Sequence, residues 1–195
     1  MAVSRAGLAS FPAGITANAV TVSHSHPDHS NFYAVRGQPQ VIQAPGSYQV
    51  GGIQITGLQG DHGLVDGKPT GNNIVFVFEI GGIKIVHMGA AGIVTQQPVL
   101  DALRDADVVV LDVMGDEAHP AQDEITQMLG LGVRTMIPAH YSFDGQPLYY
   151  GSQTLSTFLA GVPASLAQVH PGSVLEIQAG MPVQLAVMDP SANAQ

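Results

Sequence analysis

The chain has 195 residues, of which 45% are hydrophobic and only 11% carry a charge, and its formal net charge is −9. Because 6 Lys and Arg stand against 15 Asp and Glu, the chain offers no basic surface for a phosphate backbone, and we expect no nucleic-acid partner. The length suits one domain over residues 1–195, and the 23 glycines favour many short buried strands joined by tight turns over a helical bundle.

Neither end of the chain nor its cysteine content points to secretion or to a membrane. The segment from Met1 to Gly7 has one basic residue but no sustained apolar run after it, unlike a signal peptide. No stretch approaches the roughly 20 apolar residues that span a bilayer. The absence of cysteine removes both disulfides and thiolate ligands. We therefore expect a soluble, cytoplasmic protein with no membrane partner.

Short strands dominate the first half of the chain. Apolar runs and alternation of apolar with polar residues predict strands over residues 19–22, 40–43, 51–58, 73–80 and 83–87. The pair Gly81-Gly82 separates the last two runs and predicts a tight hairpin between them. Residues 64–72 are expected to form a loop because of their Gly, Pro and Asp content.

Helices and strands alternate in the second half. Helical spacing of apolar residues predicts helices over 96–106, 121–131 and 153–159. Strands are expected over 108–112, 134–140, 173–177 and 182–187. Several of these strands end on a histidine or an aspartate. Strands first, followed by helices alternating with strands, indicate sheets that are packed together and covered by helices.

The first strand runs into His24-Ser25-His26-Pro27-Asp28-His29. In an extended segment, side chains two positions apart point the same way, so His24 and His26 can converge on one ion. Pro27 then turns the backbone and brings round Asp28 and His29. Imidazole and carboxylate suit Zn²⁺, Mn²⁺ or another divalent ion. The alternative for any one of these histidines is a solvated turn, but four ligand-type residues in six positions favour a metal site.

The pattern His-x-His-x-Asp-His resembles the signature of the metallo-β-lactamase superfamily. His62, the turn from Gly89 to Gly92, and the run from Ile137 to Tyr141 follow in the order found in its ascorbate-6-phosphate lactonase-like branch. The resemblance implies an α/β (α+β) fold, an αββα sandwich with one or two metal ions between the sheets. It implies a first ion held by His24, His26 and His62 and a second held by Asp28, His29 and His140. Asp28 and His140 are also the expected catalytic residues.

Two departures from the family pattern matter. The turn at Gly89 usually continues with an aspartate that bridges both ions, and here Ala90 stands at that position. Double occupancy should therefore be weakened, because a shared carboxylate offsets the repulsion between two divalent ions. The segment before His24 is also short, which suggests a fold shortened at its N-terminus. An uncovered edge would favour a homo-oligomer, simplest as a dimer that exchanges residues 1–18.

The function expected from this pattern is that of a metal-dependent hydrolase. Three histidines would leave an open position at the ion for a water molecule that attacks an ester, lactone or phosphoester in a small-molecule substrate. The alternative is a catalytically silent member of the fold that binds one metal and acts as a binding or structural module. Either reading requires one or two ions per chain.

Other polar residues remain open to two interpretations. His87 is either a partner of the metal ligands or a core histidine, and Tyr141 either orients substrate or packs. Asp61 and Asp112 could replace the missing carboxylate, although a turn or helix-capping role is expected for both. His119 and His170, each followed by proline, stand in turn-like contexts and are expected to be structural or solvent-exposed.

Overall fold

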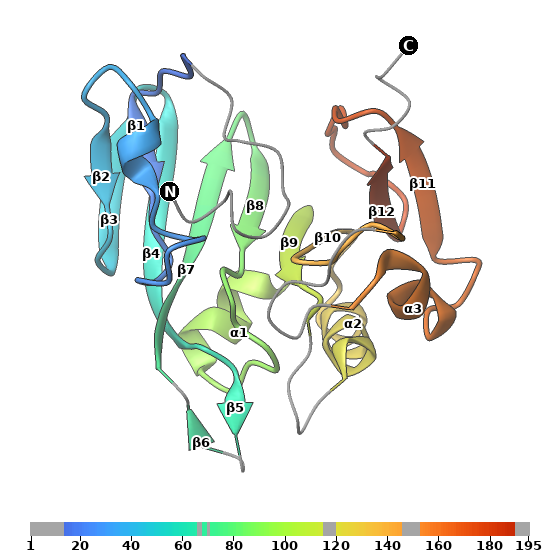
Figure 1. Ribbon diagram of the computed structural model, residues 1–195. Coiled ribbons are helices and arrows are strands. Elements are labelled where there is room, and N and C mark those ends of the chain that lie inside the picture. The colour runs from blue at the N-terminus through green and yellow to red at the C-terminus, as the bar shows by residue number, and fades with distance from the viewer. Residues whose placement is uncertain (1–13, 66–67, 70, 115–119, 146–152, 190–195) are drawn as a thin grey trace.

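The protein is described by a computed structural model that covers residues 14–65, 68–69, 71–114, 120–145 and 153–189. Its main element is an eight-stranded mixed sheet with the order β11-β12-β10-β9-β8-β7-β4-β3 (Figure 1). The strands are β3 (Gly46–Val50), β4 (Ile53–Asp61), β7 (Asn72–Ile80), β8 (Ile83–His87), β9 (Val108–Asp112), β10 (Thr135–Ala139), β11 (Ala167–Pro171) and β12 (Gln184–Asp189). The predicted mixed α/β fold is confirmed.

Smaller elements flank this sheet. A parallel pair is formed by β1 (Ala19–Thr21) and β2 (Gln40–Ile42), and an antiparallel pair by β5 (Leu64–Val65) and β6 (Lys68–Pro69). The helices are the 3₁₀ turn η2 (Phe32–Ala34), α1 (Gln97–Leu103), α2 (Ala121–Gly130) and α3 (Leu155–Ala160). Figure 1 shows β1 and β2 at the β3–β4 end of the large sheet.

The direction of the strands decides where the functional residues meet. Strands β8, β9 and β10 run parallel, whereas β7 runs antiparallel to both β8 and β4. Strand β4 therefore points the same way as β8, β9 and β10, and the carboxyl ends of all four lie along one edge of the sheet. Strand β7 begins at that same edge.

Strand β7 packs against a different layer on each of its faces. Val75 and Val77 belong to the core cluster that includes residues of α1, α2 and α3, while Ile74 and Phe76 pack with Ile42 of β2. This two-residue alternation follows from the pleat of the strand. Helices therefore cover one face of the large sheet, and the β1–β2 pair packs on the other face.

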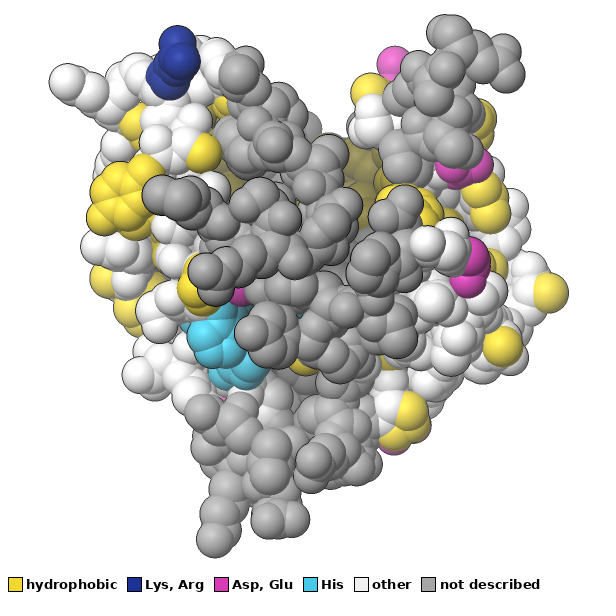
Figure 2. All heavy atoms as spheres, in the orientation of Figure 1, with side chains coloured by type: hydrophobic (Ala, Val, Ile, Leu, Met, Phe, Trp, Pro, Cys, Tyr) yellow, Lys and Arg dark blue, Asp and Glu magenta, His cyan; other side chains and the backbone are white. Residues whose placement is uncertain are grey.

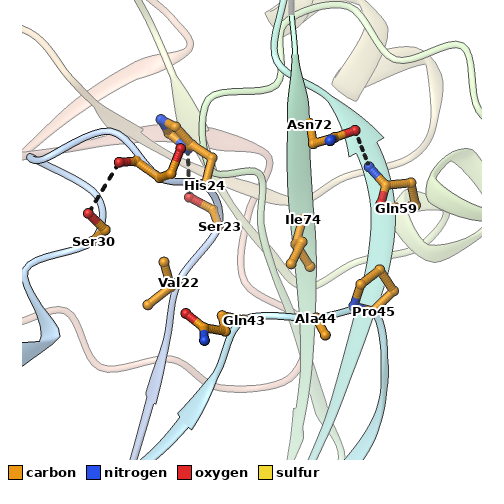
Figure 3. Close-up of a pocket in the computed structure, with 11 residues that line it drawn as sticks. Val22, Ser23, His24, Ser30, Gln43, Ala44, Pro45, Gln59, Asn72 and Ile74 are labelled. Carbon is orange, nitrogen blue, oxygen red and sulfur yellow. Dashed lines mark hydrogen bonds between the residues drawn. The ribbon is translucent and has the colours of Figure 1, made fainter.

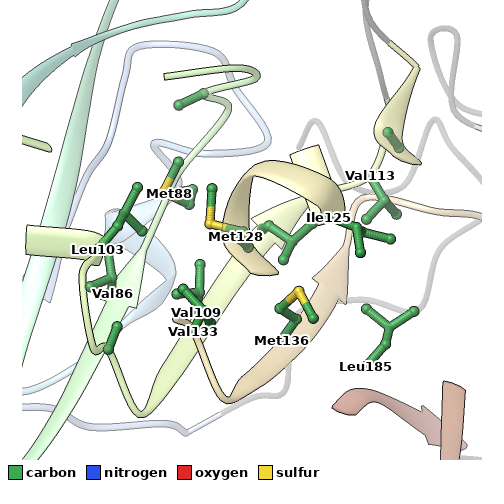
Figure 4. Close-up of a cluster of buried hydrophobic side chains, with 14 of the residues drawn as sticks. Val86, Met88, Leu103, Val109, Val113, Ile125, Met128, Val133, Met136 and Leu185 are labelled. Atoms are coloured by element: carbon green, nitrogen blue, oxygen red, sulfur yellow. The ribbon is translucent and has the colours of Figure 1, made fainter. Parts of the chain in front are cut away.

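Helix α2 shows why the predicted helices form. Its buried residues Ala121, Glu124, Ile125 and Met128 have the spacing of one helical face. The helix ends in a Schellman motif, in which Gly132 N donates to Leu129 O and Val133 N donates to Met128 O. Gly132 adopts φ +82°, a conformation that glycine tolerates. Figure 4 shows Met128 among the buried side chains between this helix and the sheet.

The hairpin predicted at Gly81-Gly82 is confirmed. Both glycines have positive φ, +59° and +85°, as a two-residue turn between twisted strands requires. The helices expected near 96–106, 121–131 and 153–159 correspond to α1, α2 and α3. Strand β3 and the short β5–β6 pair inside the expected loop were not predicted from the sequence.

One strand prediction is wrong. Residues 173–177 form no strand, and the edge of the sheet beside β12 is taken by β11, five residues of chain that end before Gly172. Gly172 has φ +86° and ends the pairing, and Val174 beyond it is 77% exposed. The apolar residues of 173–177 favour a strand locally, but β11 rather than this segment pairs with β12.

Two further expectations concern association. In the described part of the chain, no helix is long and apolar enough to cross a membrane. The homo-oligomer stays a prediction, and residues 1–13, most of the segment expected to exchange between copies, lie outside the described residues.

The core and surface faces of α2 give the first test. Met128 is 1% exposed and its neighbour Leu129 is 41% exposed. We expect Met128→Ala to lower the free energy of unfolding by about 2–5 kcal/mol, because a buried cavity is left behind. Leu129→Ala is the matched control and should change it by less than about 0.5 kcal/mol. Denaturant unfolding of both variants checks this, and equal losses would contradict the assigned helix face.

Candidate metal centre

The expected ligands come together at the sheet edge where the strands end. His62 follows β4, and His140 follows β10. His24 and His26 follow β1, whose continuation is tied to the large sheet because Ser23 O accepts a hydrogen bond of 2.8 Å from Ile74 N in β7. Three separate segments thus deliver side chains to one place.

His24, His26 and His62 form the first ligand group. Each of the three rings offers one nitrogen, and these three nitrogens lie within 4.8 Å of one another. The ring centroids are 4.6 Å apart for His24 and His26, 4.6 Å for His24 and His62, and 4.8 Å for His26 and His62. Three imidazoles at this spacing can bind a single divalent ion.

His24 is the buried member of this group. It is 9% exposed, and its Nε2 has no hydrogen-bond partner among the described residues. Its Nδ1 lies 3.0 Å from Ser23 Oγ. A ring that donates Nδ1–H to Ser23 presents the Nε2 lone pair to an ion. Burial, together with the nearby rings of His29, His62 and His26, lowers the pKa of His24 to about 3, so the ring is neutral at pH 7 and can act as a ligand.

Asp28, His29 and His140 form the second group, again with one ligand atom each within 4.8 Å of one another. Asp28 Oδ2 lies 3.5 Å from His29 Nε2 and 3.9 Å from His140 Nε2. The turn that presents Asp28 and His29 is closed by a hydrogen bond of 2.9 Å from His29 N to His26 O. Burial lowers the pKa of His29, and the Asp28 carboxylate acts in the opposite direction.

His140 is held by a residue of the neighbouring strand. Its Nδ1 is 2.9 Å from Asp112 Oδ2, and this hydrogen bond raises the pKa of His140 even though burial opposes the shift. The backbone of His140 has φ +67°, in the left-handed region that costs a non-glycine residue about 1 kcal/mol or more. A fixed partner for the ring is consistent with this conformation.

The residues present fit a metal ion. A buried imidazole nitrogen without a partner is costly, and an ion among His24, His26 and His62 would satisfy it. The donors are imidazole and carboxylate, which suit Zn²⁺ and neighbouring divalent ions. The two groups adjoin, since the ring centroids of His24 and His29 are 4.2 Å apart.

The turn after β8 packs tightly beside the first group. Gly89 has φ +67°, and a Cβ there would overlap Asn73 Oδ1 and Ser23 Cβ. Asn73, which is fully buried, accepts a 3.1 Å hydrogen bond from Ala90 N and donates one of 2.8 Å to Met88 O. Asn73 therefore fixes the backbone at Gly89 and Ala90. This turn lies next to Ser23, the residue that precedes His24.

The structure shows the contacts of the residues that had two possible roles. Asp112 Oδ1 accepts from Met114 N at 2.8 Å, the expected turn role, and its other oxygen contacts His140, which makes it a partner of a ligand as well. Asp61 accepts from Gln96 Nε2. His87 is exposed and accepts from Gly89 N, so it is not a core histidine.

The two remaining histidines are His170 and His119. His170 lies in β11 rather than in a turn, and its Nε2 is 3.1 Å from Gln184 Oε1, a structural contact between β11 and β12. His119 is outside the described residues. Tyr141 packs against the main core cluster, and burial raises its pKa.

The residues that sequence reasoning missed are Asn73 and the ligand-holding role of Asp112. A weak signal exists for each, because Asn73 opens one apolar strand and Asp112 closes another. Neither position carries a spacing that would connect it to the histidines. Only the order of strands in the sheet makes that connection.

A cavity of about 490 Å³ adjoins the site (Figure 3). His24 forms part of its wall, and the remaining lining is uncharged: Val22, Ser23, Ser25, Ser30, Gln43, Ala44, Pro45, Gln59, Asn72 and Ile74. In Figure 3, Gln59 and Asn72 lie on the far side from Ser23 and Ser30. The cavity places uncharged polar groups beside the first ligand group.

Comparison with known proteins identifies relatives of this arrangement. A family model described as a beta-lactamase superfamily domain matches residues 4–140. A UPF0173 metal-dependent hydrolase from Thermococcus onnurineus is 23% identical over 194 residues, covering 87% of this chain and 86% of the relative. Another from Alkaliphilus metalliredigens is 33% identical over 85 residues, which is 44% of this chain and only 36% of that relative.

A solved structure is also similar. It is a proposed Zn-dependent hydrolase of the metallo-β-lactamase superfamily from Thermotoga maritima, with 29% sequence identity and a TM-score of 0.66. The match covers 91% of this chain and 84% of that one. The large mixed sheet thus has a counterpart of known structure.

The first ligand group yields a direct test. We expect His26→Ala to lower both the metal content of protein purified without chelator and its melting temperature, because an ion that binds only the folded state stabilises that state. His26 is exposed, so the substitution leaves no core cavity. His170→Ala, in β11, is the control and should keep the metal content. Full occupancy in His26→Ala, measured by elemental analysis, would contradict the ligand assignment.

Proposed function

Because the chain belongs to the metallo-β-lactamase superfamily, we propose that it is a metal-dependent hydrolase that cleaves an ester, lactone or phosphoester in a small molecule. The observation that carries the proposal is the first ligand group, in which the buried Nε2 of His24 lacks a hydrogen-bond partner among the described residues and lies with His26 and His62. Relatives named as metal-dependent hydrolases support the same reaction class.

The residues of both groups have roles in this proposal. His24, His26 and His62 hold one ion, and Asp28, His29 and His140 hold a second. Bound there, Zn²⁺, Mn²⁺ or a similar ion supplies a Lewis acid and activates water near neutral pH. Asp28 Oδ2, set between His29 and His140, orients the attacking water and accepts its proton.

Access to the site is open on one side. His26 and Asp28 are exposed, and Figure 2 shows histidine side chains gathered in one patch on the surface. The cavity beside His24 can receive part of a substrate next to this patch. A small molecule can therefore reach the ligand groups without a large rearrangement of the described residues.

Ala90 favours a second candidate function. It is 7% exposed and has no ligand atom in its side chain, so the bridging carboxylate expected from the family is absent at that position. A chain with this change could bind one ion and act as a silent binding module. Measured turnover with known metal content distinguishes the two functions.

Hydrolysis should depend on the ion. We expect protein loaded with Zn²⁺ or Mn²⁺ to cleave at least one of a nitrophenyl ester, a γ-lactone and a bis-nitrophenyl phosphate, and chelation followed by reloading to abolish and restore the rate. Asp28→Asn should lower kcat by about 100-fold or more, because it loses both the proton acceptor and a ligand of the second group. Asp101→Asn, on exposed α1, serves as control. Fully loaded protein without turnover on any probe would favour the silent module.

Position 90 provides a separate test. We expect Ala90→Asp to raise the metal content towards two ions per chain and to increase the rate on the same probes, because a carboxylate there offsets the repulsion between the ions. Ala91→Asp is not a suitable control, since Ala91 belongs to the core cluster; Ala90→Asn, which has a similar shape and no charge, is the matched one. Unchanged stoichiometry in a folded Ala90→Asp protein would show that position 90 does not face the ions.

A further inference from the structure

Asp112 is a buried carboxylate whose two oxygens both have partners. The side chain is 8% exposed, Oδ2 lies 2.9 Å from His140 Nδ1, and Oδ1 accepts a hydrogen bond of 2.8 Å from Met114 N. A carboxylate bound at both oxygens has little freedom to rotate. Asp112 is therefore a fixed point against which the ring of His140 is oriented.

The sheet register explains this contact. Asp112 is the last residue of β9 and stands opposite Ala139, the last residue of β10, with a further hydrogen bond of 3.0 Å from Val113 N to Ala139 O. His140 is the next residue. The paired ends of two parallel strands thus set the distance between the carboxylate and the ring.

The orientation of the ring has a chemical consequence. With Nδ1–H donated to Asp112, His140 directs Nε2 towards Asp28, whose Oδ2 is 3.9 Å away. Donation of Nδ1–H to a carboxylate also makes Nε2 more basic and a stronger metal ligand. The ring is thereby prepared for an ion shared with Asp28 and His29.

Charge gives a second, independent argument. Position 90 contributes no carboxylate, and Asp28 is the only acidic member of the two ligand groups. Asp112 is a further carboxylate, and it lies in direct contact with His140. The buried carboxylate of Asp112 attracts a cation held by His29 and His140, because charges inside the protein are weakly screened.

We propose that Asp112 is a positioning residue that makes the Asp28–His29–His140 group a working metal site in spite of Ala90: it aims His140 Nε2 at the ion and supplies buried negative charge from outside the ligand set. The inference deepens the proposed function, because the second ion is the one that the missing bridge would weaken. The first group is delivered by the segments that follow β1 and β4 rather than by the β9–β10 pair.

The test is calorimetric titration of metal-free protein with Zn²⁺, repeated with Co²⁺ by absorption. We expect two binding events in the wild type. In Asp112→Asn the second should be about 10–100-fold weaker, while the first stays within about 2-fold, because partners of ligand histidines change affinity by that much. Asp107→Asn is the matched control: Asp107 immediately precedes β9 at the opposite end of the strand and accepts from Lys84 N. It should titrate like the wild type.

Three outcomes overturn the proposal: a single event in the wild type, an unchanged second event in Asp112→Asn, or equal weakening of both events, which would mark Asp112 as structural only. Should Asp112→Asn fail to fold, nitrogen NMR of the wild-type histidine rings decides. His140 Nδ1 must keep its proton after two equivalents of Zn²⁺, and loss of that proton overturns the proposal.

These measurements report ion binding and need no substrate. A protein that binds two ions as described but cleaves no probe would disprove the proposed hydrolase while leaving the role of Asp112 intact. Conversely, hydrolysis accompanied by unchanged titration of Asp112→Asn would disprove the role of Asp112 alone.

Discussion

The candidate site depends on the direction of the strands in one mixed sheet. Because β4, β8, β9 and β10 all point the same way, their carboxyl ends share an edge. His62, Asp112 and His140 come from three of those ends. If a single strand of the series were reversed, its ligand would lie at the opposite edge of the sheet, several residues of strand away. Topology, rather than the histidine-rich turn alone, assembles the second half of the site.

Packing on both faces keeps that edge in place. The helices α1, α2 and α3 bury one face of the sheet, and β2 with its neighbours buries Ile74 and Phe76 on the other. Asn73 at the start of β7 then fixes the turn at Gly89, against which Ser23 packs. The backbone around His24 is therefore held by buried hydrogen bonds and close contacts. Ligands fixed before the ion binds lose little conformational entropy when it does.

Charge is scarce in this chain, and the site uses it in few places. His24 is a neutral imidazole at pH 7, so it supplies a donor atom without a charge, which is compatible with its burial. Asp28 lies at the exposed side and Asp112 at the buried side of the second group. Ala90 contributes no carboxylate, and the negative charge of the site lies on the side of His140. The two ligand groups therefore differ in charge.

The sequence by itself determined the nature of the site and much of the secondary structure. Six candidate ligands could be named because His24 to His29 is a dense local pattern and because the family resemblance adds His62 and His140. The Gly81-Gly82 hairpin and the face of α2 also follow from local rules, since turn geometry and helical periodicity act over a few residues. The strand expected at 173–177 failed because the choice of an edge strand depends on a partner far along the chain. The roles of Asn73 and of Asp112 as the partner of His140 were not found for the same reason: each acts on a residue brought close only by strand order, 28 positions away for Asp112 and His140 and 17 for Asn73 and Ala90. Local sequence specifies which groups can bind an ion, whereas hydrogen bonding across the sheet decides which groups support them.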